Sequence, residues 1–94
     1  MRKKTQGIYE LVTEALESIS KPYGEDVIED VLLAIEEQPN WLEKYNKLVQ
    51  ELSENEVNRR IGRYTKEITG LETLSEGVDA KRSKIAGKYT KLRS

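Results

Sequence analysis

The 94-residue chain contains no cysteine and no histidine, and its net charge at pH 7 is −1. These absences exclude disulfides, thiolate metal sites, the commonest general base and most zinc ligand sets. The length suits a single helical domain over residues 1–94. The longest apolar run, Val31 to Ile35, is too short for a membrane span or a signal segment, so we expect a cytoplasmic protein without a membrane partner.

Apolar residues recur at helical spacing from the start of the chain, which predicts an all-α fold. The first predicted helix covers about residues 5–20 and turns Glu10, Glu14 and Glu17 toward solvent. The segment 21–24 interrupts it, because proline disfavours a helical residue before it and glycine permits a turn.

The second predicted helix follows Glu25 and Asp26, which we place in its first turn, where acids suit the helix dipole. Its apolar residues, between 27 and 35, cover more than a single stripe. We therefore expect this helix to be the most buried of the bundle.

The third predicted helix begins at Asn40, which forms a capping-box-like pair with Glu43, and reaches about Leu52. Trp41 and Tyr45 lie on the same stripe as its leucines. This placement predicts that both aromatic residues are core anchors rather than a ligand platform.

The fourth predicted helix covers about residues 54–69 and has the clearest ends. Ser53 followed by Glu56 is a capping box, and Gly70 followed by Leu71 is typical of a Schellman stop. One face is apolar and consists of Val57, Ile61, Tyr64 and Ile68. We expect the opposite, basic face to lie in solvent.

A fifth, basic helix is predicted over about residues 73–92 and starts at the box-like pair Thr73 and Glu76. Gly77 and Gly87 weaken it by about 1 kcal/mol each relative to alanine, so we expect it to be mobile or partner-dependent. No segment alternates well enough to predict a strand. The expected fold is a compact bundle of four to five short helices, with a helix-turn-helix-like pair at the third and fourth.

Charge is distributed unevenly along the chain. Residues 10–56 contain thirteen acids and three lysines, whereas residues 57–94 contain ten basic residues and four acids. This asymmetry indicates an anionic partner for the basic half. A second interpretation remains open, in which the two halves attract each other inside the fold or between protomers.

No pattern in the sequence predicts catalysis. The acids Glu25, Asp26, Glu29 and Asp30 cluster, but no histidine completes a metal-binding pair and no calcium-loop spacing is present. We expect these acids to form a solvated helix face. Phosphate-cradling glycine loops and nucleophile motifs are also absent, so we expect a protein that is not an enzyme and has no cofactor.

The basic helix at residues 54–69 predicts binding to double-stranded DNA. In a helix-turn-helix, the first residues of the second helix contact base edges; here these are Asn55, Asn58 and Arg59. Further contacts are expected from Arg60, Arg63, Lys66, Lys81, Arg82, Lys84 and Lys88. A basic arm, Arg2, Lys3 and Lys4, would add non-specific contacts. Gly62 lets the backbone approach a phosphate or lets two helices pack closely. The resulting hypothesis is a small regulatory DNA-binding protein, with a homodimer as an open alternative to a monomer.

A protein-interaction module is the competing hypothesis. The acidic first half could dock a basic protein partner, or mimic nucleic acid as an inhibitor or adaptor of the kind carried by phages and plasmids. In a further arrangement, the basic helix of one protomer lies on the acidic face of another. The sequence leaves these alternatives open.

Overall fold

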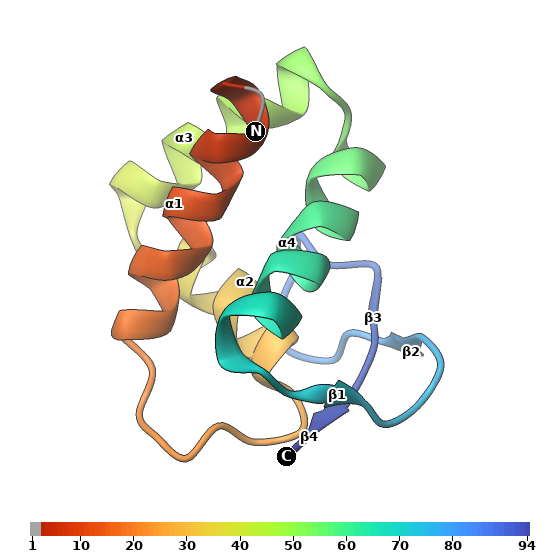
Figure 1. Cartoon of the computed structure of the whole chain (residues 1–94). Helices are drawn as coiled ribbons and strands as arrows, with labels where there is room; N and C mark the ends of the chain where they lie inside the picture. Colours follow the sequence, from red (N-terminus) through yellow and green to blue (C-terminus); the bar gives the residue numbers. More distant parts are fainter. Residues whose placement is uncertain (1–2) are drawn as a thin grey trace.

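The described part of the chain has four helices between residues 3 and 69, and a segment of short strands follows them (Figure 1). The computed structural model describes residues 3–94, and their side chains from residue 5 onward. The helices are α1 (Lys3–Glu17), α2 (Val27–Glu37), α3 (Pro39–Glu51) and α4 (Glu54–Thr69). The strands are β1 (Glu72–Thr73), β2 (Val78–Asp79), β3 (Lys88–Tyr89) and β4 (Leu92–Arg93). The described chain is therefore mainly helical but not all-α.

Both ends of α4 lie where the sequence predicts them. Ser53 caps the helix by accepting a hydrogen bond from the amide of Glu56 at 3.1 Å. Gly70 ends it in the left-handed conformation, with φ 73°. The carboxylate of Glu56 pairs with Arg59 and Arg60 instead of reaching back to Ser53. Local sequence signals therefore define the helix that carries most of the candidate site.

The start of α3 differs from the prediction. Gln38 caps the helix, since its Oε1 accepts from the amide of Asn40 at 2.7 Å, and Pro39 is the first helical residue. Proline suits this position because its fixed φ is helical and the helix leaves that amide without a partner. The predicted capping pair of Asn40 and Glu43 is therefore wrong.

The ends of the first two helices are displaced by smaller amounts. α1 ends at Glu17, before the predicted limit near residue 20. α2 begins at Val27, so Glu25 and Asp26 precede the helix, and the acids of its first turn are Glu29 and Asp30. The first turn of α2 therefore contains Glu29 and Asp30 instead of Glu25 and Asp26.

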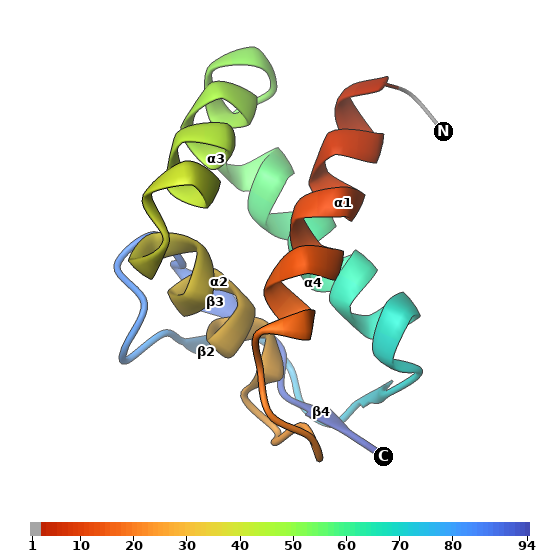
Figure 2. The ribbon, with the colours of Figure 1, turned by 90° about the vertical axis from the view of Figure 1, so that its left-hand side faces the viewer.

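The apolar faces of the four helices meet in one core, with α2 between the other helices and the strand segment (Figures 1 and 2). Six of the eleven residues of α2 are buried, a larger share than in any other described helix, as predicted. Tyr45 of α3 is buried, and Trp41 packs against the core from a partly exposed position. The Cα radius of gyration is 12.0 Å, about that of a compact chain of this length.

The helix predicted over residues 73–92 is wrong. In its place β1 pairs antiparallel with β4, and β2 pairs with β3. Thr73 lies opposite Leu92, and Val78 lies opposite Tyr89. Val78, Tyr89 and Leu92 fall at helical spacing in the sequence. In the fold Val78 and Tyr89 face each other across β2 and β3, and Leu92 belongs to the other strand pair. The predicted capping pair of Thr73 and Glu76 is therefore also wrong, because Thr73 belongs to β1.

Two carboxylates of α2 hold the loop between β2 and β3. Glu29 is 2% exposed and accepts hydrogen bonds from three consecutive amides: Lys81 at 2.7 Å, Arg82 at 2.8 Å and Ser83 at 3.3 Å. Two turns along α2, Glu36 accepts from the amides of Lys84 and Ile85 and from the hydroxyl of Ser83. We call these contacts the α2 clasp. In a helix, such amides bond to carbonyls of the preceding turn, so the clasp competes directly with helix formation.

The other acids near the start of α2 also bind the C-terminal segment. Asp30 accepts a hydrogen bond from the Arg82 guanidinium at 2.5 Å. The Nε of the same guanidinium donates to Glu29 at 3.2 Å. Asp26 accepts from the Tyr89 hydroxyl at 2.6 Å and lies 3.9 Å from the Lys91 ammonium. The predicted solvated acidic face is therefore wrong for these residues. The contacts support the interpretation in which the acidic and basic halves attract each other inside the fold.

The clasp makes the fold sensitive to acid. Burial alone raises the pKa of Glu29, but the three amides and Arg82 outweigh it and hold the pKa below 4.5. Because this native pKa is depressed, the ionised carboxylate contributes its full stability above about pH 4.5, and that contribution is lost as pH falls through the native pKa.

We predict that Glu29→Gln lowers the free energy of unfolding at neutral pH by about 1.5–3 kcal/mol, because an amide side chain cannot replace a carboxylate that accepts several charge-assisted bonds. The variant should also lose less stability than the wild type on acidification. Urea unfolding from neutral pH to about pH 3 measures both effects.

Glu37→Gln is the matched control, since Glu37 is exposed on the same helix and its carboxylate makes no ion pair with a described residue. It should change the free energy of unfolding by less than about 0.5 kcal/mol. If the two variants unfold alike at every pH, the role assigned to Glu29 is wrong.

Candidate nucleic-acid interface

Asn58, one of the three residues predicted to contact bases, is engaged inside the protein. Its Oδ1 accepts from the Tyr45 hydroxyl at 2.7 Å, and its Nδ2 donates to the carbonyl of Ile85 at 3.0 Å. Burial, and then the nearby charge of Glu54, raise the pKa of Tyr45 to about 12, so its hydroxyl remains a donor at neutral pH. Asn58 therefore joins α3, α4 and the C-terminal segment, and we remove it from the proposed base contacts.

The other predicted contact residues of α4 differ in whether their side chains form ion pairs. Asn55 is exposed at the start of the helix. Arg59 pairs with Glu56, and the Nε of Arg63 lies 3.4 Å from the carboxylate of Glu67. Both arginine side chains are mostly exposed, at 75% and 68%. Exposed pairs of this kind contribute little to stability, so both guanidinium groups can exchange their partner for a phosphate.

Arg60 and Lys66 differ in how exposed their side chains are. The Arg60 side chain is 31% exposed, lies 3.9 Å from the carboxylate of Glu56 and has a buried Nε without a hydrogen-bond partner among the described residues. Lys66 is exposed, and no described carboxylate pairs with it. It lies seven residues after Arg59 and three after Arg63, on the same side of the helix. Lys66 is therefore available to an anion and Arg60 is not.

The four predicted contacts from the C-terminal segment also separate into two groups. Arg82 is bound to two acids of α2. Lys81 lines a polar hollow beside Asp26 and Asp79. Lys84 and Lys88 are exposed, and no described carboxylate pairs with either side chain. The ammonium groups of these two lysines form no ion pair with a described carboxylate, although the amide of Lys84 donates to Glu36 and Lys88 lies opposite Asp79 in the pair of β2 and β3.

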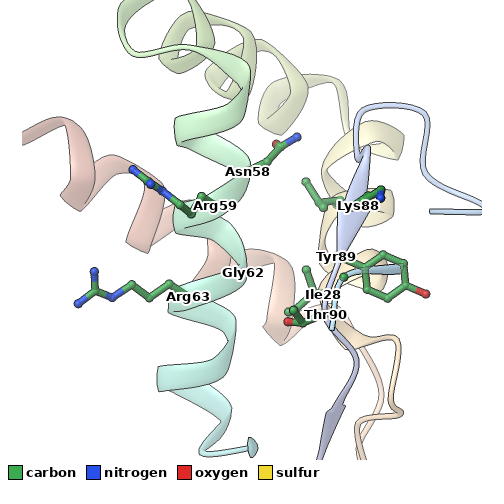
Figure 3. A pocket seen from close by; sticks show the side chains of 10 residues that line it. Ile28, Asn58, Arg59, Gly62, Arg63, Lys88, Tyr89 and Thr90 are labelled. Atoms are coloured by element: carbon green, nitrogen blue, oxygen red, sulfur yellow. The ribbon is translucent and has the colours of Figure 1, made fainter. Parts of the chain in front are cut away.

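A cleft separates the middle of α4 from β3 (Figure 3). Its volume is about 230 Å³. Gly62 marks the α4 side, and the side chains of Ile28 and Thr90 lie opposite it. A Cβ at Gly62 would stand 3.7 Å from Ile28, an ordinary contact, so the glycine leaves part of the cleft open. Gly62 thus faces α2 across a partly open gap, and it is not required there by a tight helix contact.

The cleft is the site where basic residues from distant parts of the chain come together. Arg59 and Arg63 line it from α4, and Lys88 lines it from β3. Figure 3 shows the two guanidinium groups on the side of α4 away from β3, so their aliphatic stems form the wall. None of the described residues that line this cleft is an acid. Three other hollows of the described surface each contain two or more carboxylates.

The remaining predicted contacts are outside what the structure describes. Arg2 and the side chains of Lys3 and Lys4, the predicted basic arm, fall outside the described residues. Over residues 5–94, no group of acidic side chains is arranged to hold a metal ion. None of the helices described here has the length and apolar content needed to cross a membrane.

Comparisons with known proteins identify no relative. No protein-family model, no curated protein and no solved structure significantly matches the chain. The geometry of the described residues is therefore the whole basis for a functional hypothesis.

The sequence analysis missed the structural role of Asn58 and the placement of β3 across the cleft from α4. A signal for the first was present, because Asn58 adjoins Val57 and lies three residues before Ile61, at the edge of the buried stripe. Polar residues at such edges often bond to a neighbouring element. The position of β3 beside α4 had no local signal in the sequence, because it depends on a loop held by α2.

We predict that Asn58→Ala lowers the free energy of unfolding by about 1–3 kcal/mol, because the Tyr45 hydroxyl and the Ile85 carbonyl lose their partner away from bulk water. Asn55→Ala, an asparagine replacement on the exposed start of the same helix, should cost less than about 0.5 kcal/mol. Thermal or urea unfolding compares them. A fully stable Asn58→Ala protein would contradict the bridging role.

Proposed function

We propose that the protein binds double-stranded DNA through the basic side of α4 and the adjacent lysines of the C-terminal segment. One observation carries the proposal: the fold places Arg59, Arg63 and Lys88 around a cleft that no described acid lines. Two of these residues come from a helix and the third from a strand 25 residues further along the chain. No described acid lines the cleft itself, and outside it Arg59 pairs with Glu56 and Arg63 with Glu67.

The proposed contacts are to phosphates. Arg59, Arg63 and Lys66 share one side of α4. Lys88 lies across the cleft, and Lys84 is exposed in the loop before β3. Phosphate contacts position a protein on DNA but carry no sequence information. Because Asn58 is occupied by Tyr45 and Ile85, the proposal needs no helix-turn-helix reading of bases by α3 and α4.

The alternative, a protein-interaction module acting through the acidic half, is supported by a narrower observation. Several acids of α2 bind within the chain and are not free for a partner. The acids that remain include Glu10, Glu14 and Glu51, which border a hollow between α1 and α3. This hollow also contains Lys44 and Lys47, so its charge is mixed. We therefore place DNA binding first.

We predict that the wild-type protein binds a duplex of random sequence with an affinity that falls as salt rises. Replacing both Arg63 and Lys88 by alanine should lower the slope of log affinity against log salt by about two, one unit for each phosphate contact. Fluorescence anisotropy with a labelled duplex at several salt concentrations measures the slope.

The control replaces Lys44 and Lys47 on α3 by alanine, which removes the same charge from a hollow that also holds acids. This variant should keep the wild-type slope, and circular dichroism should show both variants folded. Absence of salt-dependent binding by the wild type at low ionic strength would end the DNA proposal. A single protein partner captured without nuclease sensitivity would then favour the interaction module.

A further inference from the structure

One exposed face of α1 carries three acids that form no ion pair within the described chain. We call them the acidic stripe, and its members are Glu10, Glu14 and Glu17. At about 100° per residue they fall within about 60° of arc. The lysines of α3 across the neighbouring hollow do not neutralise the stripe, since Lys47 pairs with Glu43 and no described carboxylate pairs with Lys44.

α4 carries a basic stripe with the same spacing. Its members are Arg59, Arg63 and Lys66, so both stripes advance by four and then three residues. With a rise of about 1.5 Å per residue, the charges of two parallel helices coincide along the axis, and those of two antiparallel helices differ by about 1.5 Å at most. Each acid of one stripe can therefore meet one basic residue of the other in either direction.

The two stripes of one molecule cannot contact each other. α1 and α4 lie side by side and their buried faces meet, with the rings of Tyr9 and Tyr64 5.4 Å apart in an edge-to-face contact (Figures 1 and 2). Each stripe lies on the side of its helix opposite the buried residues. The complementary charge for each stripe therefore has to come from another molecule.

The glutamates beside the basic stripe leave it able to bind a further carboxylate. Glu56 contacts the Nη2 of Arg59, and Glu67 contacts the Nε of Arg63. A guanidinium has five N–H donors, so each arginine keeps donors for a second acid. Lys66 is exposed, and no described carboxylate pairs with it.

The surface beside the acidic stripe suits the stems of basic side chains. A hollow along α1 is lined by Tyr9 and Thr13 together with Glu10 and Glu14. Arginine and lysine pack their aliphatic stems on such a surface, and a cation over a tyrosine ring adds attraction. The net charge of −1 leaves no strong overall repulsion between two copies of the chain.

We propose that the protein associates with a second copy of itself through the acidic stripe of one molecule and the basic stripe of the other. The partner is the same chain because this chain carries the complementary charges at the matching spacing. The inference does not depend on the proposed affinity for DNA, although a bound duplex and a second copy would compete for the basic stripe. An interface of this kind depends on charge and weakens as salt rises.

Two charge reversals test the interface. Glu10→Lys with Glu14→Lys makes both stripes of one variant mainly basic, and Arg59→Glu with Arg63→Glu makes both stripes of the other mainly acidic. Each variant should self-associate at least about 100-fold more weakly than the wild type, because like charges then face each other. The protein with all four reversals keeps the wild-type net charge and should associate again, since opposite charges face each other once more.

Sedimentation analysis over a concentration series, at low ionic strength and at about 1 M salt, measures the association. Glu37→Lys with Glu76→Lys is the matched control, because it adds the same charge at exposed acids outside both stripes. This control should associate like the wild type, and circular dichroism should show every variant folded. Should a reversed variant unfold, Glu14→Gln and Arg63→Gln give the same comparison with a smaller expected loss.

A wild-type protein that stays monomeric up to about 1 mM at low ionic strength would overturn the inference. Association that the reversals do not weaken, or that the fourfold variant does not recover, would overturn it equally. Duplex binding by a protein that remains monomeric refutes the inference but keeps the proposed function. Stripe-dependent association without duplex affinity refutes the proposed function alone.

Discussion

Five hydrogen bonds determine how the second half of the molecule is arranged. They run from the consecutive amides of residues 81–85 to the carboxylates of Glu29 and Glu36. A carboxylate accepts several bonds at once, and ionised acceptors make stronger bonds than neutral ones. Two such groups on one helix can therefore hold a loop that has little apolar surface of its own. Once the loop is fixed, β2 and β3 can pair, and the chain returns past α2 so that β4 pairs with β1.

This arrangement also creates the candidate site. Ile85, the last residue of the α2 clasp, offers its carbonyl to Asn58, which links the loop to α4. β3 follows three residues later and brings Lys88 beside Arg59 and Arg63. The same acids that appear as surplus negative charge in the sequence thus position the basic residues. Asp26, Glu29, Asp30 and Glu36 are engaged inside the fold, and no described acid lines the cleft.

The sequence predicts elements with local signals and fails where distant residues decide. The cap at Ser53 and the stop at Gly70 depend on neighbours within a few residues, and both were found. The sequence predicts a helix after Gly70 because Val78 and Tyr89 fall at helical spacing, but these two residues are cross-strand partners. Its strands depend on acids some 50 residues earlier, a relation that no local pattern contains. Within the site, the charges of Arg59, Arg63 and Lys88 could be predicted, but the cleft between them could not.

Hydrogen exchange at the amides of Lys81 to Ile85 tests the central claim most directly. In the folded protein at neutral pH, these five amides should exchange far more slowly than the amide of Glu76, which lies in the exposed turn between β1 and β2. Glu29→Gln should restore fast exchange at residues 81–83 while the helical core stays protected. Five amides that exchange as fast as that of Glu76 in the wild type would contradict the account, because the α2 clasp would then not be formed.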